Sequence, residues 1–292
     1  MYPRSMVDSD CVVVMGSNMA ENHPVAFRWP MKAKVENGAK LIHVDPRFTR
    51  TSAVADIYAP IRAGSDIAFL GGVISYVLAS ERWQRDPFFR EWVVNYTNAA
   101  TLITEEFKDT EDLDGVFSGL MEYKGGRAEW PFNALTAEYQ SDTWQYARTS
   151  IGDQGRVANT AQSGETNGVE SGTKPGDAKN VSSRPPFDDL VKRLVKPTPE
   201  TDPTLQDPRC VLQVVKRHYA RYTPEMVERV TGCPRETFLR VAQTILDNSG
   251  AERTTSFAYA VAWTQHTYGV QIIGACALLQ LLLGNAGRPG AG

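Results

Sequence analysis

The chain has 292 residues, of which 42% are apolar, enough for a packed core and against wholesale disorder. Its 31 basic and 34 acidic residues give a formal net charge of −3, which disfavours a general nucleic-acid binder or a protein of anionic membrane surfaces. Four cysteines, Cys11, Cys210, Cys233 and Cys276, form no CxxC pair. A zinc knuckle, an iron–sulfur cluster held within this chain and a disulfide framework are therefore all disfavoured.

The first 45 residues predict a strand, a turn, a helix and a second strand. The continuous apolar run 11–15 is typical of a buried parallel strand, and Gly16, Ser17 and Asn18 end it with turn formers. A helix from about Pro24 to Val35 and a strand over 40–44 complete a βαβ unit. This pattern predicts an α/β fold, a three-layer αβα dinucleotide-binding domain around a parallel sheet.

Further elements follow in chain order. The spacing predicts a short strand over 57–61, a helix that opens at Ser65 or Asp66 and runs to Leu78, and a helix over 87–94. From about 105 to 208 the sequence is polar, and 149–186 is rich in Gly, Ser, Thr, Asn and Asp. Such a run buries too little to offset its chain entropy. Either a surface loop or a partner-binding arm accounts for it.

Regular patterns resume at Pro208. They predict three helices, over 211–219, 223–232 and 234–246, then a strand over 255–262, a loop over 263–267 and a last helix over 271–283. We therefore divide the chain into a first part of the α/β domain at 1–104, a polar insertion at 105–206, a helical continuation at 207–250, and the start of a second α/β domain at 251–292.

Two turns that follow predicted strands are candidate ligand sites. The turn at Gly16 feeds a helix, and backbone N–H groups at such a turn suit a phosphate, although a purely structural turn explains it equally well. Asp45, after the second strand, is placed to accept hydrogen bonds from ribose hydroxyls, and Arg47 and Arg50 to pair with phosphates. A surface salt bridge is the competing reading of these charges.

Two later loops are further candidates. Asp66, after Gly64 and Ser65, is either a helix cap or a carboxylate that accepts two N–H bonds from the edge of a guanine. Gln265 and His266, in the loop after the last strand, suit a polar heterocycle, although a lone histidine is more often structural. No Ser/His/Asp or Cys/His set and no pair of glycosidase carboxylates stands out.

Taken together, these segments resemble the molybdopterin oxidoreductases, which carry molybdenum or tungsten on two molybdopterin guanine dinucleotides. The resemblance rests on the segments 15–24, 44–51, 55–66, 263–267 and 282–290. Within that family the chain is most similar to the alpha (major) subunit of respiratory formate dehydrogenases, often selenocysteine enzymes, and the run 221–227 supports this narrower match. The polar segment from about Tyr123 to Pro203 and the first ten residues fit the family pattern poorly.

The resemblance implies a role in cofactor binding for each matching position. It implies that the nucleotide and diphosphate are lined by Gly16, Ser17, Asn18, Glu21 and His23, and that the ribose and phosphate region is held by Asp45 and Arg47. It further implies that the guanine is surrounded by Gly64, Ser65 and Asp66, and that a pterin is approached by Gln265 and the backbone near Val261. It implies no catalytic residue and no metal ligand within this chain.

The resemblance also implies a longer protein, of which this chain would be an internal fragment. The [4Fe-4S] module, the selenocysteine or cysteine metal ligand and the domain that completes the cofactor cradle are family features that this sequence does not contain. In a selenocysteine gene, an in-frame UGA codon misread as a stop would explain why the assigned sequence begins just downstream of it. The DNA upstream of Met1 tests this idea, because it should contain that UGA codon. We expect the fragment alone to be inactive.

For the full-length enzyme, the family implies formate as substrate, an iron–sulfur beta subunit, a membrane cytochrome gamma subunit, and a periplasmic or membrane-associated complex that donates electrons in anaerobic respiration. No nucleic-acid partner is expected. Another oxidoreductase of the family, such as a nitrate reductase, and a noncatalytic scaffold of the same fold are the alternatives.

Overall fold

The structure is a computed structural model that describes residues 3–105, 107, 122–123, 137–138, 146–147 and 199–292. The predicted segment 149–186 and most of the predicted insertion 105–206 lie outside the described residues. The chain forms two compact units, one made of 1–99 with 215–292 and the other of 100–214.

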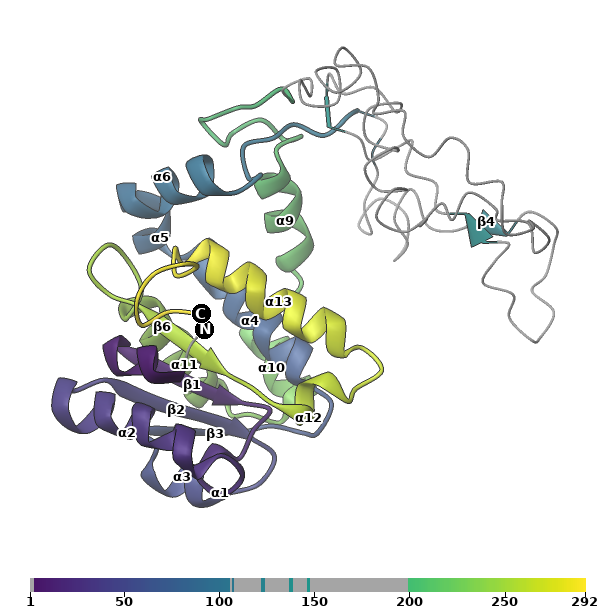
Figure 1. Cartoon of the computed structure of the whole chain (residues 1–292). Coiled ribbons are helices and arrows are strands. Elements are labelled where there is room, and N and C mark those ends of the chain that lie inside the picture. The colour runs from purple at the N-terminus through teal and green to yellow at the C-terminus, as the bar shows by residue number, and fades with distance from the viewer. Residues whose placement is uncertain (1–2, 106, 108–121, 124–136, 139–145, 148–198) are drawn as a thin grey trace, which may run out of the picture. The chain divides into compact units, whose positions relative to one another are not determined.

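The first unit is built on a four-stranded sheet in the order β3-β2-β1-β6 (Figure 1). All neighbouring strands are parallel, and Cys11 pairs with Lys40 on one side and with Thr255 on the other. The strands are β1 (Cys11–Met15), β2 (Lys40–Asp45), β3 (Ile57–Pro60) and β6 (Thr255–Ala258). The predicted α/β class with a parallel sheet is therefore confirmed.

Helices cover the sheet and connect its strands. In the first unit and at its junction with the second they are the 3-10 helix η1 (Pro3–Asp8) and the α-helices α1 (Met19–Asn22), α2 (Pro24–Asn37), α3 (Arg50–Val54), α4 (Asp66–Ala79), α5 (Glu81–Arg85), α6 (Pro87–Tyr96), α9 (Val211–Tyr219), α10 (Pro224–Thr231), α11 (Arg235–Asp247), α12 (Val261–Thr264) and α13 (Gly269–Leu282). Among the residues that the structure describes, no helix has the length and apolar character that crossing a membrane requires.

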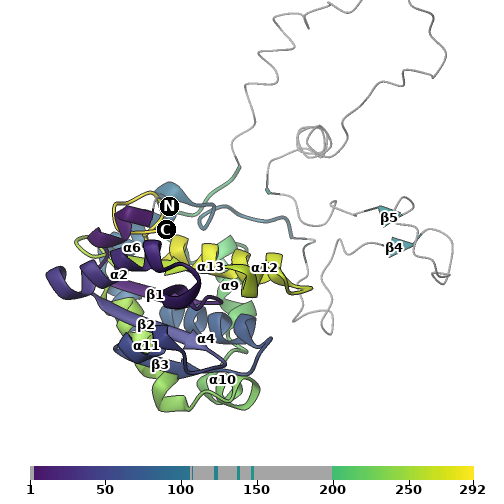
Figure 2. The same ribbon diagram turned by 60° about the horizontal axis from the view of Figure 1, so that its bottom comes forward.

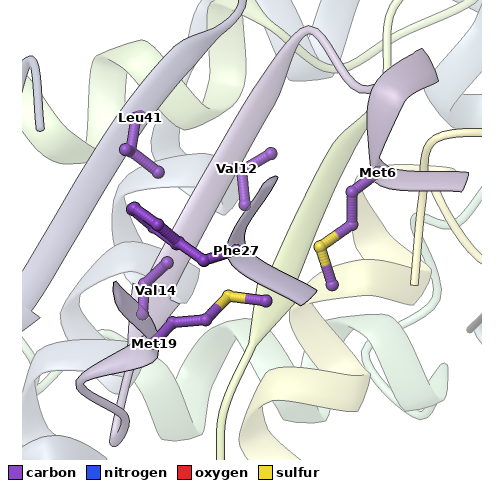
Figure 3. Close-up of a cluster of buried hydrophobic side chains, with 6 residues drawn as sticks. All are labelled: Met6, Val12, Val14, Met19, Phe27 and Leu41. Carbon is purple, nitrogen blue, oxygen red and sulfur yellow. The ribbon is translucent and has the colours of Figure 1, made fainter. Parts of the chain in front are cut away.

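The core lies on the two faces of β1. Every residue of β1 is buried, as expected for a strand covered on both sides. Side chains alternate between the faces, so Val12 and Val14 point to the same side. There they pack with the side chains of neighbouring elements, as Figure 3 shows for Met6, Met19, Phe27 and Leu41. The opposite layer contains α4, which packs against α10, α11 and α13 (Figure 2).

The end of the chain differs from the sequence-based expectation. The predicted strand 255–262 stops at Ala258, and the short helix α12 stands where we expected the last strand residues and part of a loop. The segment predicted to start a second domain instead supplies β6, which pairs with β1 along Cys11–Val14. The physical reason is that a buried central strand needs hydrogen-bond partners on both of its edges.

The described part of the second unit contains an ordered turn at Asp202. Its carboxylate accepts hydrogen bonds from the backbone N–H groups of Thr204, Gln206 and Asp207 at 2.8, 2.9 and 2.8 Å. The hydroxyl of Thr204 donates to the same carboxylate, and together these bonds hold the pKa of Asp202 well below its usual value. The unit also contains the two-residue antiparallel strands β4 (Glu122–Tyr123) and β5 (Ala137–Glu138).

Candidate nucleotide-binding site

All four candidate segments follow strands of the same parallel sheet. The turn 16–21 follows β1, Asp45 ends β2, 64–66 follows β3, and 261–265 follows β6. Because the strands are parallel, their carboxyl ends share one edge (Figure 1). The chain leaves β1 towards β2 while β6 lies on the other side of β1. Such a reversal of strand order is where open α/β sheets bind ligands.

Gly16 occupies a position that only glycine suits. Its φ is +72°, a left-handed conformation, and a Cβ atom placed on it would lie 2.8 Å from both Cγ and Nε1 of Trp263. In a phosphate-binding turn, a glycine without a side chain lets the ligand approach the backbone. The structure instead places the buried indole of Trp263 against this backbone, so a ligand would have to approach the turn from another side.

Asp66 is a buried carboxylate at the first position of α4. It is 7% exposed, and the indole N–H of Trp263 donates to its Oδ1 at 3.0 Å. Burial raises the pKa of Asp66 and the charge of Asp45 adds to this rise, while the Trp263 hydrogen bond and His266 act in the opposite direction. Ser65 precedes Asp66 as the N-cap residue but makes no capping bond, because its hydroxyl donates to the Arg62 carbonyl at 2.6 Å.

Gly64 is held by an aromatic residue from the far end of the chain. The hydroxyl of Tyr268 donates to the Gly64 carbonyl, and the ring of Tyr268 stacks on His266 with centroids 5.4 Å apart. The φ of Gly64 is +83°. Contacts from the β6 side thus fix the loop that leads into α4.

The turn after β1 is held by α3. The hydroxyl of Thr51 donates to the Asn18 side-chain oxygen at 2.9 Å and accepts from the backbone N–H of Ala20 at 3.0 Å. The amide of Asn18 donates to Glu21, and this bond is the main cause of a lowered Glu21 pKa. The Nε atom of Arg50 lies 3.6 Å from Oε1 of Glu21, and both side chains are exposed. Asn18 is the N-cap residue of α1 but makes no side-chain capping bond to that helix.

A buried histidine joins the same turn to β2 and α3. His43 is fully buried, with Nδ1 2.8 Å from Ser52 Oγ and Nε2 3.2 Å from the Ser17 carbonyl oxygen. A carbonyl only accepts, so Nε2 carries the proton and Nδ1 accepts from Ser52. Burial lowers the pKa of His43. Asp45, 3.8 Å from Nε2, acts in the opposite direction.

The remaining predicted residues lie at the surface of this edge. Asp45 accepts from the backbone N–H of Arg47 at 2.7 Å, and the Arg47 side chain is exposed. His23, Val261 and Gln265 are exposed as well. His23 also borders a surface cavity of about 480 Å³. The edge therefore combines the carboxylates of Glu21, Asp45 and Asp66 with the exposed guanidinium groups of Arg47 and Arg50.

This donor set fits a dinucleotide. Carboxylates such as Asp45 and Asp66 accept from ribose hydroxyls and from the N–H groups of guanine, and Arg47 and Arg50 suit phosphate oxygens. Within the described ranges, no group of three or more His, Cys, Asp or Glu side chains is placed to hold a metal ion.

Sequence reasoning missed three residues that shape the edge: His43, Ser52 and Tyr268. His43 had a signal, because a titratable residue interrupts an otherwise apolar strand run in 41–44. Ser52 and Tyr268 had none, since their roles depend on contacts with distant parts of the chain.

The fold and this edge define an α/β protein with candidate ligand-binding residues at the carboxyl ends of its parallel strands. The family described as Molybdopterin oxidoreductase matches residues 4–292. The chain belongs to the molybdopterin oxidoreductase family. The match runs through the polar segment 123–203, and how well that segment fits the family pattern stays a prediction.

The chain is also similar to individual proteins. The chain is 40% identical over 285 residues to the formate dehydrogenase-O major subunit of Escherichia coli (strain K12), covering 98% of this chain and 22% of that protein. It is 39% identical over 90 residues to the periplasmic nitrate reductase of Desulfovibrio desulfuricans, covering 30% of this chain and 12% of that protein. The solved acetylene hydratase from Pelobacter acetylenicus gives a TM-score of 0.44 at 16% identity, over 96% of this chain and 22% of that one.

Proposed function

We propose that this chain is a cofactor-binding segment of a formate dehydrogenase catalytic subunit that carries a molybdopterin guanine dinucleotide. The chain spans about a fifth of the length of the formate dehydrogenase that it matches, so the activity belongs to a longer protein. The observation that carries the proposal is the convergence of four family-matching segments on one carboxyl edge of a parallel sheet.

Each residue of the edge has a task that its chemistry supports. The carboxylate of Asp66 accepts from the guanine, with Gly64 and Ser65 shaping the loop around it. Asp45 accepts from the ribose, and Arg47 offsets phosphate charge. The turn with Gly16, Ser17, Asn18, Glu21 and His23 lines the diphosphate and nucleotide, while Gln265 and the backbone near Val261 approach a pterin.

The bound molybdenum or tungsten centre supplies the two-electron oxidation of formate to carbon dioxide. The residues of this chain bind and orient the dinucleotide. They also exclude water from the guanine end of the dinucleotide, next to the buried side chains of Asp66 and Trp263. In the longer protein, iron–sulfur clusters, an iron–sulfur beta subunit and a membrane cytochrome subunit would serve as the electron acceptors.

Calorimetric titration of the 292-residue chain with GDP tests the nucleotide site. We expect GDP to bind and ADP to bind far more weakly, because Asp66 accepts from N–H groups on the guanine edge that adenine lacks. The variant D66N, which replaces one acceptor oxygen by an N–H donor, should lose most of this preference. Equal binding of GDP and ADP, or of GDP to wild type and D66N, contradicts the assignment.

A formate-dependent dye-reduction assay tests the reaction. The longer protein that contains this segment should reduce the dye with formate, and the 292-residue chain by itself should show no turnover. Turnover by the isolated chain contradicts the proposal that it contributes only cofactor binding.

A nitrate reductase is the second candidate within the family. The nitrate reductase similarity covers 30% of this chain, whereas the formate dehydrogenase similarity covers 98%. The longer match favours formate. Nitrate-dependent oxidation of a reduced dye by the longer protein, without formate activity, would reverse this ranking, and a longer protein without bound molybdopterin would favour a noncatalytic scaffold.

A further inference from the structure

We propose that Trp263 is a positioning residue that fixes the Asp66 carboxylate for guanine recognition while its ring closes the space over Gly16. This inference rests on the proposed function, because it concerns how that carboxylate is presented to the nucleotide.

One indole ring makes three separate contacts at the edge. Its N–H donates to Asp66 Oδ1 at 3.0 Å, and its ring carbon and nitrogen atoms lie against Gly16. Its outer face stacks on Tyr259, with centroids 4.9 Å apart and an interplanar angle of 21°. Trp263 is itself 0% exposed. It thereby connects the turn after β1, the start of α4 and the segment after β6.

The hydrogen bond has a consequence for recognition. A guanine edge offers two parallel N–H donors, so the plane of the accepting carboxylate has to be fixed. The terminal torsion of an aspartate is broad and roughly two-fold, and leaves this plane free. The indole nitrogen donates one hydrogen bond in a fixed direction, whereas each carboxylate oxygen can accept two hydrogen bonds. Trp263 can therefore fix Asp66 and leave acceptor positions open.

The charges around Asp66 make its ionisation depend on the hydrogen bond from Trp263. Asp45, at the end of β2, repels the Asp66 carboxylate, and His266, after α12, attracts it. The backbone at the start of α4 also donates to it. Loss of the indole N–H therefore favours the protonated acid, which is a poorer acceptor for guanine.

A purely structural tryptophan would behave differently. It would stabilise the fold without affecting the protonation of Asp66 or the pH dependence of nucleotide binding. Trp83 offers such a control, because it is 4% exposed and its N–H donates to the Leu282 carbonyl at 2.7 Å, within the helical packing of α5 and α13.

The experiment compares W263F with W83F in the 292-residue chain, using GDP as the probe. We expect W263F to weaken GDP binding about tenfold at pH 7, the lower range for a hydrogen bond to a charged group. The pH midpoint below which GDP binding is lost should also move upward. W83F should keep the wild-type affinity and midpoint, and folding of each variant is checked by circular dichroism.

A second measurement follows the indole directly and does not need a folded W263F. The indole ¹H–¹⁵N signal of Trp263 should shift with pH as Asp66 titrates, and should stop doing so in D66N. A signal insensitive to pH, a shift that persists in D66N, or a W263F variant with the affinity and midpoint of W83F overturns the inference. If the wild-type signal titrates but GDP does not bind, the proposed function fails while the link between Trp263 and Asp66 holds.

Discussion

The carboxyl edge of the sheet has two halves of opposite character. In the buried half, Trp263 packs against Gly16 and donates a hydrogen bond to Asp66, and Trp263 and Asp66 are 0% and 7% exposed. After β2, the side chains of Arg47 and Arg50 are exposed and Phe48 is 68% exposed. We infer that the two halves differ in role: the buried half fixes the position of the Asp66 carboxylate, and the exposed half supplies positive charge for phosphate. Substitutions in the buried half should therefore affect stability as well as nucleotide binding, and those in the exposed half should affect nucleotide binding alone.

The largest effect on the free energy of unfolding is expected from a substitution at Gly16. In G16A, the new methyl group meets the Trp263 ring and the residue keeps an unfavourable left-handed conformation, so we expect a loss of about 3 kcal/mol of unfolding free energy. Urea denaturation measures it. G38A is the matched control, because Gly38 also has a φ of +72° but has nothing within 4 Å of its Cβ position. If the two variants lose equal stability, the packing against Trp263 is unimportant.

The next effect is expected at His43. H43V leaves the Ser17 carbonyl and the Ser52 hydroxyl without this partner, at a cost of about 1–3 kcal/mol. The histidine also makes stability depend on pH. Its folded-state pKa is lowered, so the unfolded chain binds the proton more readily, and stability is lost as pH falls below the unfolded value of about 6.5.

Denaturation of wild type and H43V at pH 7.5 and pH 5.5 checks this sign. The stability difference between the two should be larger at pH 7.5 than at pH 5.5, because only the wild type loses the contribution of a neutral His43. H23Q, which removes an exposed imidazole, serves as the control. A difference that is constant or grows on acidification would show that His43 is protonated in the fold.

Asp66 should show the opposite sign. Its folded-state pKa is raised by burial, so the native state binds the proton more readily, and stability declines as pH rises from about 3.9 through the folded pKa. D66N retains an acceptor for Trp263 and removes the buried charge. We expect D66N to gain stability relative to wild type as pH rises to 7, measured by thermal unfolding. A D66N variant less stable than wild type at pH 7 would mean that the carboxylate charge stabilises the fold.

The smallest effect on stability is expected in the exposed half. R47A should leave the denaturation midpoint nearly unchanged and weaken GDP binding about three- to tenfold, with a weaker dependence on salt, since an exposed guanidinium attracts phosphate. R85A is the control, an exposed arginine on α5 that pairs with Glu81 at 3.3 Å. Equal GDP affinity for R47A and R85A would remove Arg47 from the phosphate region.

Much of the fold could be predicted because its signals are local. The apolar run 11–15 predicted β1 to the residue, and the helix predicted from about Pro24 to Val35 ends two residues before α2 does. The helices α1, α3 and α5, with four or five residues each, were missed because such short segments show no clear helical period. The partner of β1 on its second edge was missed because nothing near Cys11 in the sequence points to Thr255.

The candidate site divides in the same way. Its segments could be placed at one edge, since the carboxyl ends of parallel strands always meet there. The contacts within the edge could not be predicted. The sequence placed Gly16 in the turn after β1, but it did not show that its neighbour is Trp263, 247 positions further along the chain. Whether these residues bind a nucleotide stays a prediction.

The pairing of β1 with β6 also bears on how the protein acquires its structure during synthesis. Asp10 and Thr254, at the start of these strands, form a hydrogen bond across 244 residues. At a synthesis rate of about 5–20 residues per second, roughly 12 to 50 seconds separate the emergence of the two strands. During this interval β1 can pair with β2 and leave its other edge open to wrong partners. A nascent chain would therefore benefit from a chaperone until β6 arrives, and only then could Trp263 reach Gly16 and Asp66.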